Sequence, residues 1–228
     1  MKRMKILGLC LVATFALSGL AVAQASAIEF VWKVNGKKLE TGQEKTLTSK
    51  AKTNQVLKAT LAGVPVEITC TTVSTAGAKI IGGTPGTSTE TVEYKGCTVQ
   101  KPAGCKVKGE AITTNPLKDE IVEGLGASAG KALLLFAPVT GTTFAEPKLE
   151  GGLLCLSVAV KGSVLAEAVP QKEEVETGIL KFEPANGKAS KGSKGEARKD
   201  GLTVGGNAAT VTGEVETKLS PVEKFGVF

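Results

Sequence analysis

The chain has 228 residues, with 28 lysine and arginine residues against 22 acidic ones and a net charge of +6 at neutral pH. It contains no histidine, which excludes a Ser-His-Asp or Cys-His catalytic apparatus and His-ligated zinc in their usual forms. Only 4% of the residues are aromatic, so an exposed aromatic platform for sugars or single-stranded nucleic acid is not expected either.

Residues 1–27 have the three-part layout of a secretory signal peptide. A positively charged start is followed by an apolar run over 6–22 and by small-x-small sites that end at Ala23 and Ala27. The run is short for a spanning helix, which needs ~20 apolar residues, so we expect cleavage rather than a retained membrane span. Cleavage is expected after Ala27, with Ala23 as the second choice. The predicted location is therefore secreted, or the extracellular face of the cell envelope.

Cleavage leaves residues 28–228 as one β-rich exported domain with a small basic excess. It carries 25 basic and 22 acidic residues, because the leader holds three basic residues and no acidic ones. Nucleic-acid binders usually show a stronger and more clustered excess, so no nucleic-acid partner is expected. A mild positive charge instead permits loose attraction to an anionic cell-envelope polymer.

Short runs of β-branched and apolar residues, separated by Gly, Pro and Asn, predict strands along the mature chain. The run over 28–34 ends at Asn35-Gly36, a strong signal for a two-residue hairpin turn. In the next run, over 64–73, apolar and polar residues alternate as in a half-buried strand. Further strands are expected at 131–137, 154–160, 162–168, 178–183 and 209–216.

Helix signals are poor throughout the chain. The charged stretch 172–177 has room for one turn, but it lacks an apolar stripe. The glycine-rich stretch 82–86 is interpreted as a tight turn rather than a phosphate loop. These patterns predict an all-β fold, either a sandwich or an irregular barrel of short, mostly antiparallel strands.

Four cysteines remain after removal of the leader, and an even number in an exported chain predicts two disulfides. Three pairings are possible among them. The turn at 100–104 favours Cys97–Cys105, which leaves Cys70–Cys155. The chain has no Cys-x-x-Cys pair, so neither a metal site nor a cofactor is expected. The four residues are Cys70, Cys97, Cys105 and Cys155.

The glycine-rich segment 124–131 imitates several catalytic motifs. Its Gly-x-Ser-x-Gly match would need a histidine to activate the serine, and its dinucleotide-fingerprint match would need a βαβ unit. What remains is Ser128 and Lys131, a Ser-x-x-Lys pair in which a lysine of lowered pKa could activate the serine. The companion motifs of penicillin-recognising enzymes are missing, and a turn into the strand 131–137 explains the segment equally well. No catalytic residue is therefore assigned.

Residues 186–201 are rich in Gly, Lys and Ser and predict a flexible basic loop. The simpler interpretation is a solvated hairpin tip, since charge runs are usually solvated faces. The alternative is a contact with an anionic surface. Its basic residues are Lys188, Lys191, Lys194, Arg198 and Lys199.

Residues 64–168 contain a framework of cysteines and glycines with short flanking motifs. These are Ile68-Thr69-Cys70, Gly82-Gly83, Gly96-Cys97, Cys105-Lys106-Val107, Ile112-Thr113-Thr114-Asn115-Pro116-Leu117, Leu154-Cys155 and Val160-Lys161-Gly162-Ser163-Val164. This framework resembles a group of uncharacterised exported four-cysteine proteins of high-GC Gram-positive bacteria. The resemblance implies an exported four-cysteine β domain and transfers no catalytic or binding residue.

The expected function is that of a non-catalytic envelope or extracellular protein with a structural, adhesive or binding role. Self-association through exposed strand edges is a further expected mode of action. Two alternatives stay open. One is an exported hydrolase that uses Ser128 and Lys131 or a pair of glutamates, and the other is a barrel that holds an apolar ligand.

Overall fold

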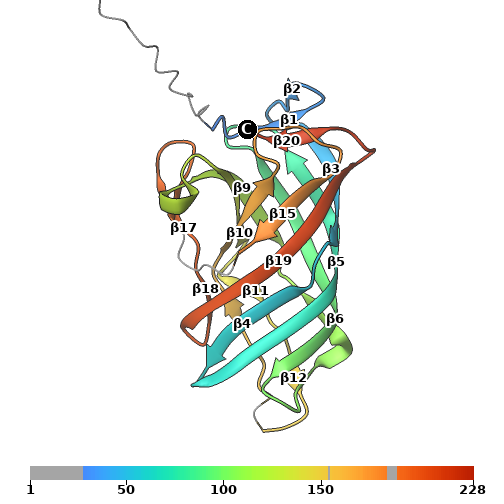
Figure 1. Ribbon diagram of the computed structural model, residues 1–228, viewed down its shortest axis with the longest axis vertical. Coiled ribbons are helices and arrows are strands. Elements are labelled where there is room, and N and C mark those ends of the chain that lie inside the picture. The colour runs from blue at the N-terminus through green and yellow to red at the C-terminus, as the bar shows by residue number, and fades with distance from the viewer. Residues whose placement is uncertain (1–27, 154, 184–188) are drawn as a thin grey trace, which may run out of the picture.

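The computed structural model describes residues 28–153, 155–183 and 189–228 (Figure 1). These segments contain strands, turns and two short 3-10 helices, at Lys108–Glu110 and Gly126–Ser128, and no α-helix. The predicted all-β fold with antiparallel pairing and two disulfides is confirmed. The predicted signal peptide at 1–27 lies outside the described residues.

Eight antiparallel strands of the described segments close into a barrel. Each strand pairs with the next, and the last returns to pair with the first. Closure leaves no unpaired edge around this ring, in contrast to an open sandwich. In order around the ring the strands are β3 (Glu44–Ala51), β5 (Val64–Ile81), β6 (Thr87–Lys101), β9 (Leu117–Gly124), β10 (Ala132–Pro138), β14 (Val164–Val169), β15 (Gly178–Phe182) and β19 (Asn207–Ser220).

The three longest strands, β5, β6 and β19, continue beyond the first ring and build a second one below it, so the molecule is elongated along the barrel axis (Figure 1). Between β5 and β19 the place of β3 is taken by β4 (Gln55–Leu61). On the opposite side the bridge between Thr114 and Ala145 joins the remaining strands. These are β8 (Ala111–Thr113), β11 (Thr143–Ala145), β13 (Val160–Lys161) and β18 (Leu202–Val204).

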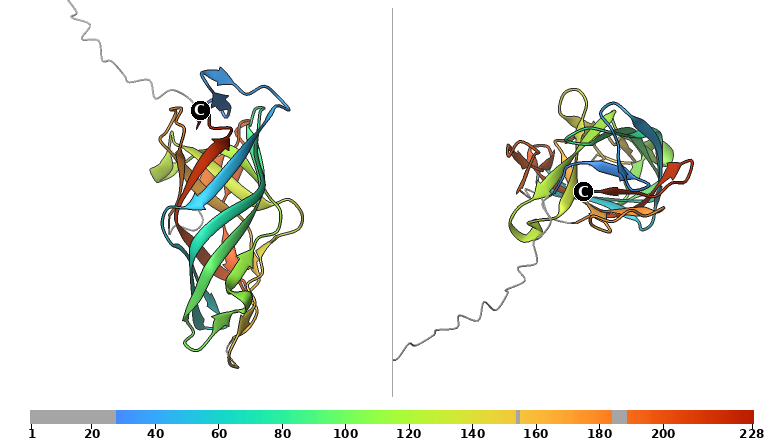
Figure 2. Two further views of the ribbon diagram at one scale, coloured as in Figure 1. Left: turned by 90° about the vertical axis from the view of Figure 1, so that its right-hand side faces the viewer. Right: turned by 90° about the horizontal axis from the view of Figure 1, so that it is seen from above.

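A three-stranded cap lies across the upper mouth of the barrel, as the view from above shows (Figure 2). Its strands are β1 (Trp32–Val34), β2 (Lys37–Lys38) and β20 (Phe225–Val227). The predicted turn at Asn35-Gly36 joins β1 to β2, with both residues at positive φ. Gly86 lets the cap approach the barrel, because a Cβ there would come within 2.7 Å of the Trp32 ring.

The disulfides join Cys70 to Cys97 and Cys105 to Cys155, so the expected pairing of Cys97 with Cys105 was wrong. Cys70 and Cys97 face each other in the ladder between β5 and β6, with Cα atoms 4.0 Å apart. Strand β6 continues to Lys101, so Cys97 lies inside the ladder with β5 rather than at the start of a turn. The turn at 100–104, which favoured Cys97–Cys105, therefore lies beyond the residue that it was expected to pair. Cys105 lies beyond the strand end, against the loop that carries Cys155.

The predicted strand at 154–160 was also wrong over most of its length. Of the described residues 155–160 only Val160 lies in a strand, β13 (Val160–Lys161), and Leu156 is 55% exposed. Leu154 lies outside the described residues. The segment is held by the Cys105–Cys155 disulfide and by a hydrogen bond from the Val158 amide to the Pro147 carbonyl. A short ladder between β7 (Lys106–Val107) and β12 (Leu149–Glu150) completes this lower tip.

The barrel interior is filled by one large apolar cluster that runs through both rings. A second buried cluster lies on the outer side of the β9–β10–β14 wall, because its members alternate with inward residues along those strands. Beside it a hairpin of β16 (Ala189–Lys191) and β17 (Ala197–Lys199) pairs with β9. The outer cluster consists of Val122, Leu133, Leu135 and Leu165.

Candidate functional site

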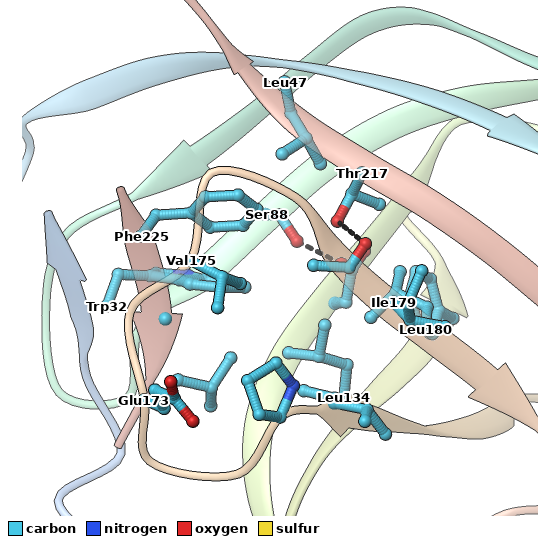
Figure 3. A pocket seen from close by; sticks show the side chains of 18 of the residues that line it. Trp32, Leu47, Ser88, Leu134, Glu173, Val175, Ile179, Leu180, Thr217 and Phe225 are labelled. Atoms are coloured by element: carbon cyan, nitrogen blue, oxygen red, sulfur yellow. Dashed lines mark hydrogen bonds between the residues drawn. The ribbon is translucent and has the colours of Figure 1, made fainter. Parts of the chain in front are cut away.

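The most unusual feature of the barrel is a polar chamber inside its upper ring, directly below the cap (Figure 3). The cavity has a volume of about 30 Å³. Trp32 and Phe225 of the cap line it from above, and Leu134 and Phe136 of β10 line it from the barrel wall. Four polar side chains on the inner face of the barrel strands line it, Ser88, Glu90, Asp119 and Thr217, and the exposed Glu173 adds a fifth from a loop.

Strand alternation points these polar groups into the barrel. Ser88 and Glu90 precede the buried Val92 on the same face of β6. Asp119 lies between the buried Leu117 and Ile121 on the inner face of β9. Ser88 is the direct cross-strand partner of Asp119, which makes Glu90 its diagonal neighbour. Such neighbours have Cβ atoms about 7–8 Å apart, so the two carboxyl groups share one region of the core.

The hydrogen bonds of the chamber leave one carboxylate oxygen without a partner. The Ser88 hydroxyl donates to Oδ2 of Asp119, and the Thr217 hydroxyl donates to the Gly178 carbonyl oxygen at 3.3 Å (Figure 3). Oδ1 of Asp119 has no hydrogen-bond partner within the described chain, although the side chain is buried. An unsatisfied buried acceptor of this kind is costly, and it marks the place where a proton, a water molecule or an ion would be stabilised.

Burial raises the pKa values of both chamber acids, Asp119 and Glu90. It raises the pKa of Asp119 to about 7, although the Ser88 hydrogen bond opposes the shift. Burial, followed by repulsion from Asp119, raises the pKa of Glu90 to about 8. Burial and the nearby Glu90 also raise the pKa of Tyr94. Near neutral pH the chamber can therefore hold protons that exposed carboxyl groups would release.

None of these four residues was predicted as a site residue from the sequence, because spacing along strands does not show which strands become neighbours. One signal was present, since Asp119 is one of only two aspartates in the chain and lies next to the apolar Ile121 and Val122.

Ser128 and Lys131 lie outside the chamber, at the turn between β9 and β10. The Lys131 amide donates to the Ser128 carbonyl oxygen, while the Lys131 ammonium group lies 2.9 Å from Oε2 of Glu167. The hydrogen bond that Lys131 donates to Glu167 raises the pKa of Lys131. A lysine that activates a serine needs the opposite shift, so this environment disfavours a Ser-Lys catalytic pair.

We expect a serine-reactive phosphonate to leave Ser128 unlabelled between pH 7 and pH 10. The physical reason is that Glu167 keeps Lys131 protonated and so unable to accept a proton. Intact-mass spectrometry of the wild type and of Ser128→Ala would show no adduct in either protein. Labelling that disappears in Ser128→Ala would instead establish the hydrolase alternative.

The basic segment near 186–201 is a hairpin attached to the barrel wall over its described part. Lys191 lies 3.1 Å from Glu123, and Arg198 lies 2.6 Å from Glu120, both on β9. Lys194 is exposed at the turn of the hairpin. Lys188 and the side chain of Lys199 lie outside the described part of the chain. The ion pairs of Lys191 and Arg198 hold the hairpin in place, which leaves Lys194 as the described side chain best placed for an external contact.

A second interior cavity, in the lower ring, has a volume of about 50 Å³ and an apolar lining that includes Ile68, Tyr94 and Phe144. Ligand pockets for organic molecules usually measure about 300–1,000 Å³, so neither interior cavity has room for a substrate or a lipid chain.

Comparisons with known proteins leave the fold and the site to be interpreted from the structure alone. The chain matches no protein-family model, no curated protein and no solved structure. Across 28–153, 155–183 and 189–228, no group of three or more His, Cys, Asp and Glu side chains forms a metal cluster. No helix in those same segments is long and apolar enough to cross a membrane.

Proposed function

We propose that this chain is an exported, non-catalytic protein of the cell envelope or extracellular space that binds through its outer surface. The two disulfides are consistent with a secreted protein, since such bonds persist in oxidising compartments. The leader-like residues 1–27 support the same location.

The observation that carries the proposal is the filled interior of the barrel. Apolar side chains occupy both rings, and three cavities between them measure only about 20, 30 and 50 Å³. A barrel whose described interior is filled in this way can recognise a large partner only from outside. This disfavours the apolar-ligand barrel and a glycosidase that would use Glu90 and Asp119.

Two features of the outer surface are suited to contact. Lys194 projects from the hairpin turn. Several lysines of the barrel wall are instead held by a glutamate, as Lys50 and Lys52 are by Glu216 and Glu214. At the lower tip Leu153 is 98% exposed, in a loop tied by the disulfide at Cys155. Barrel closure leaves only short exposed edges, which disfavours self-association by strand addition.

We expect the mature protein to co-sediment with cell envelopes and to be released as salt is raised, because exposed ionic contacts are screened. Lys194→Gln should weaken binding at low salt about two- to five-fold, the range for an exposed charge pair. Leu153→Ser combined with Leu156→Ser should reduce the binding that persists at high salt.

The matched control is Lys161→Gln, which removes another exposed lysine and should bind like the wild type. Lys191 and Arg198 are left unchanged, because their replacement would detach the hairpin from β9. Absence of binding at every salt concentration would refute the proposal.

A further inference from the structure

The polar chamber gathers oxygen ligands from three strands that are far apart in the sequence. Ser88 and Glu90 come from β6, Asp119 from β9 and Thr217 from β19. The set contains carboxylate and hydroxyl oxygens and no nitrogen or sulfur. Such ligands suit hard cations, with calcium the most tolerant of irregular geometry.

An independent observation shows that this place offers a free ligand atom to a small group. Asp119 is only 2% exposed, lines the cavity, and keeps Oδ1 without a hydrogen-bond partner in the described chain. The cavity of about 30 Å³ lies next to it. That space is enough for one ion or water molecule, which needs roughly 10–15 Å³, and too small for an organic group.

The charge of the lining is complementary to a cation. The titratable groups that line the cavity within the described chain are all carboxyl groups, namely Glu90, Asp119 and, on an exposed loop, Glu173. Glu90 also lines the adjoining cavity toward the lower ring, which has no lysine or arginine in its lining. Two carboxylates in an apolar interior without a positive partner are unfavourable, and a bound cation would remove that cost.

We propose that the chamber binds one hard divalent cation of the calcium class, with Asp119 and Glu90 as its charged ligands. The two carboxylates match the charge of the ion. The hydroxyl oxygens of Ser88 and Thr217 add to its coordination, since the described residues contain no group of three acidic side chains placed to hold an ion. The ion would join β6, β9 and β19 below the cap and so stabilise the closed barrel. This inference does not depend on the proposed envelope binding.

The first test is thermal unfolding of the full mature protein at pH 8, after treatment with EDTA and removal of the chelator. Calcium chloride at 10 mM should raise Tm by about 5–10 °C if that concentration is about a hundred-fold above Kd, as linkage predicts. Asp119→Asn should lose the shift. Glu216→Gln, which changes a carboxylate on the outer wall, should keep it.

The second test reports the ion directly, even if Asp119→Asn folds poorly. Trp32 is the only tryptophan and lines the same chamber, so it can sensitise the luminescence of Tb³⁺ bound there. We expect emission at pH 7 that calcium displaces and that Trp32→Phe abolishes. No calcium-dependent Tm shift together with no sensitised emission would overturn the proposal, as would emission that persists unchanged in a folded Asp119→Asn variant.

Discussion

Replacing Cys70 and Cys97 together by alanine is expected to lower the free energy of unfolding by about 3.5 kcal/mol, and replacing Cys105 and Cys155 by about 4 kcal/mol. The two bridges span 27 and 50 residues of sequence, and the chain-entropy model makes the cost depend only weakly on that span. Urea unfolding monitored by Trp32 fluorescence would measure both values. A loss of this size is a large part of the stability of an average domain.

The structural consequences of the two replacements should differ, which provides the control. The first bridge lies inside the β5–β6 ladder, where surrounding pairs hold the strands together. The second ties the loop containing Leu153 to the end of β6, so its removal should increase proteolysis of that loop while the barrel stays folded. Equal proteolysis of the two variants would contradict this assignment, and a Cys97–Cys105 peptide in a non-reduced digest would contradict the pairing.

In the presence of EDTA, the free energy of unfolding is expected to fall as pH rises from about 5 to about 8.5. The folded-state pKa values of Asp119 and Glu90, about 7 and about 8, lie above those of the unfolded chain. Between these limits the folded protein binds more protons than the unfolded one, so each rise in pH favours unfolding. The effect is on the order of 3 kcal/mol for Asp119 alone, since its proton binding differs between the folded and unfolded states over the two pH units from pH 5 to about pH 7, each worth about 1.4 kcal/mol.

Urea unfolding at pH 5 and pH 8.5 would measure this loss, and Asp119→Asn or Glu90→Gln should flatten it. Glu216 is a matched control, because its pKa is lowered by the hydrogen bond from Lys50 and its contribution is lost only toward acid pH. Glu216→Gln should therefore keep the slope between pH 5 and pH 8.5. A wild-type protein whose stability is the same at both pH values would show that the two acids are not buried together.

The alkaline loss of stability and the calcium response would be two consequences of one arrangement. Without a cation the paired acids remain protonated or repel each other as pH rises. With a divalent ion bound, the same carboxylates become ligands, and the barrel should regain stability at pH 8. The stabilising effect of calcium should therefore be larger at pH 8 than at pH 5, where protons compete for Asp119 and Glu90.

Alternation of apolar and polar residues was sufficient to predict the strands whose apolar side chains are buried and whose polar side chains are exposed. The 64–73 run lies within β5, and the Asn35-Gly36 turn is found where its backbone preference places it. Strand β6 was missed because Ser88 and Glu90 lie on its inner face, which removes the contrast between apolar and polar residues. At 154–160 the alternation was present, but the disulfide at Cys155 holds the chain in an irregular path.

The all-β class, the four available cysteines and the absence of histidine chemistry could be predicted from the chain alone, because they depend on composition and on contacts between near neighbours. The pairing of the cysteines, and the position of Asp119 opposite Ser88 and diagonal to Glu90, became visible only in the folded protein. So did the attachment of the basic hairpin to β9 through Lys191 and Arg198. The disulfide pairing, the polar chamber and the hairpin contacts all depend on strand register and barrel closure. They bring together residues that are 27 to 78 positions apart in the sequence, and the conformational preferences of neighbouring residues do not specify contacts over such separations.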